Sequence, residues 1–170
     1  MDKSITRGLN LVTTVGLLTA TGAVTTYDTT VTIVYAINGK AATKVAVALG
    51  ATPTTDYVTG LAFPALIGGG SVANVPGNGC IVVWGLVSGG TVKCVMGPAS
   101  PLDIQGNFRY NASQFPTVPD DMVPFAYQVL KAGATASASG VVFGTALWNA
   151  AGFTNVIQNV FALPERPQVA

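Results

Sequence analysis

The sequence contains no histidine, and charged residues of both signs are scarce. The absence of histidine excludes Ser-His-Asp and Cys-His nucleophilic machinery, histidine-containing zinc sites and the most common general base. Two cysteines cannot form a four-cysteine zinc site. The glycine-rich segments IGGGS and PGNG are not followed by the Gly-Lys-Ser/Thr of a phosphate-binding loop. The sequence therefore predicts a protein that is not an enzyme and that holds no cofactor and no metal.

Charged residues make up 9% of the 170 residues, against about 25% in typical soluble domains. A folded monomer of this mass exposes about 7,800 Å², so the 8 basic and 7 acidic residues leave roughly one charge per 500 Å². Such a surface is solvated by Thr, Ser, Asn and Gly, covered by partners, or both. A net charge of +1 without a basic cluster predicts no nucleic-acid partner and no membrane-binding patch.

The abundant residue types suit short strands joined by turns. Valine and threonine are frequent, and 20 glycines and 10 prolines supply turn positions. Residues that build helix surfaces are few, and Glu165 is the only glutamate. The sequence therefore predicts an all-β fold with long Gly/Pro-rich loops. Strands are expected near residues 10–18, 22–27, 29–37, 42–49, 80–87, 91–96, 123–131, 140–147 and 155–163.

No repeat, charged run or linker divides the chain, so we expect a single β-domain over residues 29–170. Residues 1–28 are expected to form an extended N-terminal arm and the first strand. This segment is apolar but interrupted by threonine and glycine, which argues against a secretory signal or a membrane span. A helix is expected only as a short turn near Ala62–Leu66 or within Asp103–Tyr110.

The stretch VTIVYAINGKAATKVAVALG predicts a hairpin, because Asn38 and Gly39 tolerate the positive φ angles of a two-residue type I′ turn. One of its faces carries Val31, Ile33, Tyr35, Ile37, Lys40, Ala42, Lys44 and Ala46, and the other carries Thr32, Val34, Ala36, Ala41, Thr43 and Val45. Neither face is polar, which suggests that one meets the core and the other a protein neighbour. The two lysines favour the first face as the outer one, with their stems lying along it. Ile33, Tyr35, Lys40 and Lys44 are therefore predicted interface residues.

A second hairpin is predicted over CIVVWGLVSGGTVKCVMG, with its turn at Ser88-Gly89-Gly90. A three-residue loop places Cys94 opposite Trp84, about 13 Å along the strand from Cys80. That separation exceeds the reach of a disulfide, so both cysteines are expected as free buried thiols, which fits a reducing cytoplasm. The run CIVVWGLV has no polar residue and so predicts cover on both faces. A second sheet covers one face, and a loop, a subunit or a host surface covers the other.

Two loop features have alternative interpretations. Phe108, Arg109, Tyr110 and Phe115 lie in a long loop, where aromatic residues beside an arginine suit a protein interface or local packing under the loop. The adjacent acids Asp120 and Asp121 suit a turn, with calcium binding as the alternative. Asp56 is expected to form an Asx-turn.

Four segments resemble the small all-β structural proteins of tailed-bacteriophage particles, above all capsid decoration, or cement, proteins: YAINGKAATKVAVALGATPTTD, VVWGLVSGGTVKCVMGP, FPTVPDDMVPFAYQVLKAG and LPERPQVA. The resemblance implies an antiparallel, jelly-roll-like β-sandwich without catalytic residues. It implies an oligomer, dimer or trimer, made in the bacterial cytoplasm and bound to the capsid exterior. There it would bind the major capsid protein and stabilise contacts between neighbouring copies. The alternatives are a tail or head-fibre component, or a carbohydrate-binding β-sandwich module.

Overall fold

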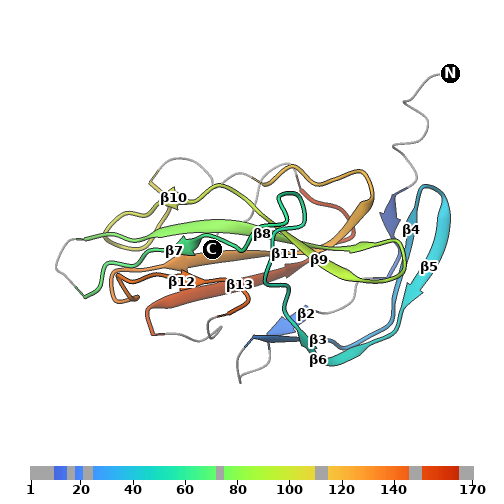
Figure 1. Cartoon of the computed structure of the whole chain (residues 1–170), viewed down its shortest axis with the longest axis horizontal. Coiled ribbons are helices and arrows are strands. Elements are labelled where there is room, and N and C mark those ends of the chain that lie inside the picture. The colour runs from blue at the N-terminus through green and yellow to red at the C-terminus, as the bar shows by residue number, and fades with distance from the viewer. Residues whose placement is uncertain are drawn as a thin grey trace, which may run out of the picture.

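The computed structural model describes residues 10–14, 18–20, 25–71, 75–109, 115–145 and 151–164. These residues form strands and loops without any helix, which confirms the all-β prediction, and all strand pairs are antiparallel (Figure 1). The strands are β1 (Leu11–Val12), β2 (Leu18–Ala20), β3 (Thr26–Thr29), β4 (Ile33–Ile37), β5 (Lys40–Lys44), β6 (Val47–Ala51), β7 (Ala65–Leu66), β8 (Asn78–Val87), β9 (Val92–Met96), β10 (Ser100–Pro101), β11 (Met122–Ala132), β12 (Val141–Val142) and β13 (Phe153–Asn159).

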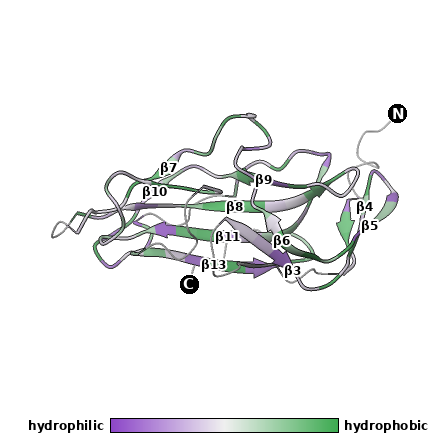
Figure 2. Cartoon of the chain, turned by 60° about the horizontal axis from the view of Figure 1, so that its bottom comes forward, coloured by the Kyte–Doolittle hydropathy of each residue, from purple (hydrophilic) through white to green (hydrophobic). Residues whose placement is uncertain are grey.

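The central sheet contains β8, β11 and β13 in that order, with β9 and β10 on the other side of β8. Every residue of β8 after Asn78 is buried, and β11 is buried except for the half-buried Pro124. Figure 2 shows β8, β11 and β13 side by side, with β13 at the lower margin of the sheet. The apolar run over residues 80–87 therefore has cover on both faces, as its sequence predicts.

The N-terminal strands form a three-stranded meander that bends in the middle. Leu11 pairs with Ala36 of β4 and Leu18 pairs with Thr29 of β3, so β1 and β2 are two pieces of one outer strand. The long hairpin over residues 26–51, which we call the bent hairpin, supplies the other two. Figure 1 shows β4 and β5 at the right margin and β3 and β6 along the lower side.

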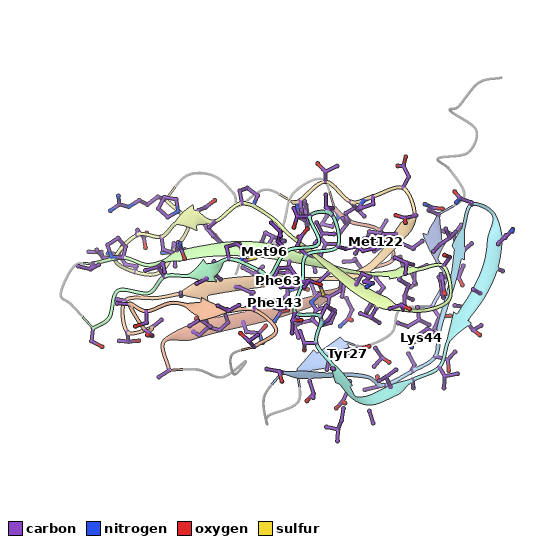
Figure 3. The ribbon with its side chains drawn as sticks, viewed as in Figure 1. Tyr27, Lys44, Phe63, Met96, Met122 and Phe143 are labelled. Atoms are coloured by element: carbon purple, nitrogen blue, oxygen red, sulfur yellow. The ribbon has the colours of Figure 1, made fainter. Side chains whose placement is uncertain are left out.

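Buried side chains cover the two faces of β8 separately. Its even-numbered residues belong to the larger cluster, which contains Cys80, Val82, Trp84 and Leu86 together with Tyr27, Ile33, Tyr35, Phe63 and Phe143. The ring of Trp84 meets the rings of Tyr27 and Phe143 edge to face, with centroids 5.3 and 5.8 Å away. Figure 3 labels Phe63 and Phe143 next to each other, and their ring centroids are 5.0 Å apart. This cluster joins the bent hairpin to the central sheet.

The odd-numbered residues of β8 face a second cluster, which contains Ile81, Val83, Val87, Val95, Met122, Tyr127 and Val129. Partly buried residues from the connecting segments close it from outside: Tyr57, Phe108, Phe115, Val118 and Leu163. The second face of the apolar run is therefore covered by the chain's own loops, one of the three kinds of cover that the sequence allows.

Both predicted turns are confirmed. Asn38 and Gly39 have φ of 50° and 75°, and Ile37 pairs with Lys40 across a two-residue loop. The second hairpin turns through three residues and places Cys94 opposite Trp84. Cys80 and Cys94 are free and buried.

Three predictions of local secondary structure are wrong. Residues Ala65–Leu66 form β7, paired with β12, because the chain there is extended between Pro64 and Gly68. Residues 103–109 make a turn closed by the Asp103 carboxylate, which accepts hydrogen bonds from the backbone N–H groups of Gln105 and Asn107 at 2.9 and 2.8 Å. The strand expected over 42–49 is two strands separated at Val45-Ala46. The boundary drawn at residue 28 falls inside β3.

Candidate protein interface

The predicted orientation of the bent hairpin is wrong. Ile33 and Tyr35 are 0% and 2% exposed, and Ile37 is buried too, so the face expected to meet a partner lies on the core. Val45, expected in the core, is 71% exposed, and Thr43 is exposed. The physical reason is size, because the Ile and Tyr side chains remove more apolar surface from water than the Val, Ala and Thr side chains opposite.

The two lysines do not prevent this burial. Lys44 is half-buried, and its methylene chain lies beside Gly90 at the β8–β9 turn, where a Cβ on Gly90 would stand 3.5 Å from the Lys44 Cδ. Figure 3 shows Lys44 on the inner side of the hairpin. Lys40 is exposed next to the turn. A lysine stem can thus lie along the edge of a core face while its amine reaches water.

The third strand of the meander, β5 followed by β6, is exposed along most of its length and almost free of charge. We call its exposed part the outer strand surface, which contains Lys40, Ala41, Thr43, Val45, Ala46, Ala48, Leu49 and Ala51. Lys40 is its only charged residue. Val45 and Leu49 expose 71% and 67% of their surface, more than any other described large apolar residue except Leu61. A small-residue strand with two protruding aliphatic side chains suits close contact with another protein.

Leu49 is held in this exposed position by a β-bulge. Tyr27 pairs with Gly50 and Thr29 with Val47, so Ala48 and Leu49 together oppose Asp28. Leu49 has a φ of 54°, and its N–H donates a 2.6 Å hydrogen bond to the Asp28 carboxylate. A left-handed conformation costs a leucine about 1–2 kcal/mol, which glycine avoids. A strained, exposed leucine is hard to explain by the stability of the fold, and this points to a role at a contact.

The predicted loop aromatics pack locally instead. The Phe115 ring meets Tyr127 edge to face at 5.1 Å, and the Lys131 amine lies 5.6 Å from the centroid of the Phe108 ring. Arg109 is exposed, and its N–H donates to the Pro101 carbonyl at 3.1 Å. Tyr110 lies outside the described residues.

The hairpin and loop groups of predicted interface residues are far apart. Phe108 lies beside Gly79 at one end of β8, whereas the Tyr35 hydroxyl lies 3.5 Å from the Val87 carbonyl oxygen at the other. At about 3.3 Å per residue these two ends are roughly 26 Å apart. The structure therefore does not gather the eight predicted residues into one site.

Four of the five carboxylates in the described part of the chain accept hydrogen bonds: those of Asp28, Asp56, Asp103 and Asp121. Asp56, buried, accepts hydrogen bonds from the N–H groups of Val58, Thr59 and Met96 at 2.9, 3.0 and 2.8 Å, which confirms its predicted Asx-turn. Asp121 lies in a turn and accepts a 2.6 Å bond from the Tyr57 hydroxyl. Within the described part of the chain, no group of acidic or cysteine side chains could hold a metal.

Tyr57 is a residue that sequence reasoning missed. Its hydrogen bond to the Asp121 carboxylate raises the pKa of its phenol, and the Lys93 amine lies 5.7 Å from its ring centroid. The cluster ties the 55–61 loop to the turn before β11. No sequence signal links these residues, which are far apart along the chain.

The thiols are poorly placed for chemistry. Burial raises the pKa of Cys80 and of Cys94 above that of an ordinary thiol, and the nearby Asp56 carboxylate raises that of Cys94 further. Both thiols are therefore protonated at neutral pH and weak as nucleophiles or ligands.

In comparisons with known proteins, no family model, curated protein or solved structure matches the chain. Among the described residues there is no helix that could cross a membrane.

Proposed function

We propose that this chain is a structural virion protein that binds the outside of a phage capsid, where it bridges neighbouring major capsid proteins. The proposal includes a jelly-roll-like β-sandwich, with the bent hairpin and the central sheet as its layers. The observation that carries it is the outer strand surface, which is exposed, nearly uncharged and formed around a strained Leu49. The resemblance of four sequence segments to decoration proteins supplies the class of partner.

The energetics suit a repeated contact. Full burial of one aliphatic side chain contributes about 1.5–3 kcal/mol, so Val45 and Leu49 supply only a weak single contact. On a particle surface, simultaneous contacts multiply such affinities without further interface area. A chain that bridges two capsid proteins therefore needs only a weak affinity for each of them.

The other classes find less support. An enzyme needs groups free to move protons, whereas the carboxylates of Asp28, Asp56 and Asp103 accept hydrogen bonds from backbone N–H groups. A carbohydrate-binding module needs an exposed aromatic platform, and Phe161 is the only aromatic among the described residues that is more than half exposed. Trp148 and Tyr110 lie outside the described residues.

The test measures binding to undecorated shells of the phage that encodes this chain, by co-sedimentation, together with the free energy of unfolding. Leu49→Gly removes the protruding side chain and relaxes the positive φ, so we expect equal or higher stability but binding weaker by about tenfold. Thr43→Lys places a charge in the same contact and should leave the fold intact but weaken binding similarly.

Thr117→Lys is the matched control, because Thr117 is an exposed threonine in the loop before β11. It should bind like the unmodified chain. Full binding by both Leu49→Gly and Thr43→Lys would refute the assigned surface. If the unmodified chain fails to bind shells but labels tails or fibres in immunogold images of virions, the capsid partner is wrong.

A further inference from the structure

Two of the outer strands in the described part of the chain have edges that differ in kind. The edge formed by β5 and β6 carries Lys40 and Lys44, is interrupted at Val45-Ala46 and contains the bulge at Leu49. Lysines, interruptions and bulges are the devices by which proteins stop an exposed edge from pairing with another chain. This edge is protected, so a contact through it uses side chains.

The edge of the central sheet formed by β13 has none of these devices. Its register with β11 runs without a break from Ala126–Asn159 to Ala132–Phe153. No proline or charged residue lies between Lys131 and Leu163. Its side chains are half-buried on both faces except the exposed Thr154, with Phe153 and Ile157 on the larger cluster and Val156 on the smaller. This is the pattern of an inner strand at the position of an outer one.

The backbone of β13 offers hydrogen-bonding groups at this edge. Gly133 N–H donates to Gly152 O, and Val160 N–H donates to Phe125 O, both at 2.9 Å. Even-numbered residues therefore bond to β11, and alternate residues point their N–H and C=O groups outward. Phe153, Asn155 and Ile157 are such residues. β2 approaches β13 at the other end, near Asn159. Trp84, Ala126 and Asn159 lie opposite one another in β8, β11 and β13, and Tyr27 of β3, the strand paired with β2, packs on Trp84.

A chain of polar side chains crosses the sheet and ends at this edge. The Trp84 indole N–H donates to Gln128 Oε1 at 3.0 Å, and Gln128 Nε2 donates to Asn155 Oδ1 at 2.6 Å. Trp84 and Gln128 are fully buried, whereas Asn155 is half-buried. The Asn155 amide nitrogen makes no hydrogen bond within the described part of the chain. It is thus a donor at the sheet edge, held in place from the core.

We infer that β13 pairs antiparallel with β13 of a second copy, about a two-fold axis that passes between the two Asn155 residues. Asn155 then faces the partner's Asn155 with Cα atoms about 5.5 Å apart, and Phe153 faces the partner's Ile157. The three outward-facing pairs form about six backbone hydrogen bonds. Each Asn155 amide donates to the free lone pair of the other's Oδ1.

A second copy fits this edge better than an unrelated strand. Two-fold pairing is self-complementary, so the same residues satisfy both sides. The larger cluster continues across the junction, because Phe153 and Ile157 lie on the same side of the sheet and Phe153 meets the partner's Ile157. A buried asparagine pair also specifies the register, since a shift leaves both amides unpaired. This inference does not depend on the capsid partner.

The experiment measures the oligomeric state of the full chain by sedimentation equilibrium over a wide range of protein concentration. Asn155→Asp keeps an acceptor oxygen for Gln128 but places two carboxylates against each other at the axis. We expect dimerisation about tenfold or more weaker at pH 7. It should recover as the pH falls through about 4–5, because the facing carboxylates raise each other's pKa above the usual 3.9.

Thr154→Lys and Thr43→Lys form the matched pair. Thr154 is exposed on β13, so its lysine variant should fold and become monomeric. It should still bind shells, with an affinity lowered only by the loss of avidity. Thr43→Lys should dimerise normally and lose shell contacts. A monomeric or trimeric unmodified chain, or an Asn155→Asp protein that dimerises fully at pH 7, would overturn the inference. Normal dimerisation without shell binding would overturn only the proposed function.

Discussion

Replacing Ile33 by alanine tests which side of the bent hairpin holds the fold together. Ile33 is 0% exposed within the larger cluster, and truncating such a residue to alanine costs about 2–5 kcal/mol. For a chain of this size each kcal/mol lowers the melting temperature by about 2–4 °C, so a 3 kcal/mol loss lowers it by about 6–12 °C. Val45→Ala, at a 71% exposed position, should stay within about 0.5 kcal/mol of the unmodified chain.

Thermal melting by circular dichroism and urea unfolding measure both variants under the same conditions. Equal m-values are required, so that the difference in midpoint reports stability and not a change in the surface exposed on unfolding. If Val45→Ala loses as much stability as Ile33→Ala, the hairpin faces have been assigned the wrong way round. The outer strand surface would then have no basis.

Two further predictions concern buried polar groups. Because burial raises the pKa of the Cys80 and Cys94 thiols, only the unfolded chain releases their protons near pH 9. The free energy of unfolding should therefore fall above that pH, by up to about 1.4 kcal/mol per pH unit for each thiol. Urea unfolding between about pH 8 and about pH 10 measures this slope. Replacing both cysteines by alanine should flatten it. Asp56→Ala leaves three N–H groups without their acceptor and should cost about 2–3 kcal/mol by the same assay, whereas a loss below about 0.5 kcal/mol would show that water replaces the carboxylate.

Local chemistry made much of the fold predictable. Asn38-Gly39 and Ser88-Gly89-Gly90 determine their turns through positive φ angles, and a turn determines the register of its hairpin. That register in turn kept Cys80 and Cys94 apart. The apolar run over residues 80–87 predicted burial on both faces, because a strand with one face open to water would expose every second residue of the run.

Tertiary choices were not predictable in the same way. The hairpin has two apolar faces, and only the packing of Ile33 and Tyr35 on the central sheet decides between them, although their larger size was an available signal. The bulge at Leu49 depends on Asp28 across the strand pair. The hydrogen-bond chain from Trp84 to Asn155 joins residues 71 positions apart through strands whose order the sequence does not state.

The position of β8 in the chain has a consequence for synthesis. The bent hairpin is contiguous, so it can form soon after it leaves the ribosome, and contacts close in sequence form fastest. β8 is different, because its apolar residues find one neighbour in β9 at once but wait for β11 on the other side. Translation from Val87 to its register partner Met122 takes about 2–7 seconds at roughly 5–20 residues per second. During that interval the nascent chain displays an uncharged strand with a free edge, so cells that make this protein in quantity will depend on chaperone capacity.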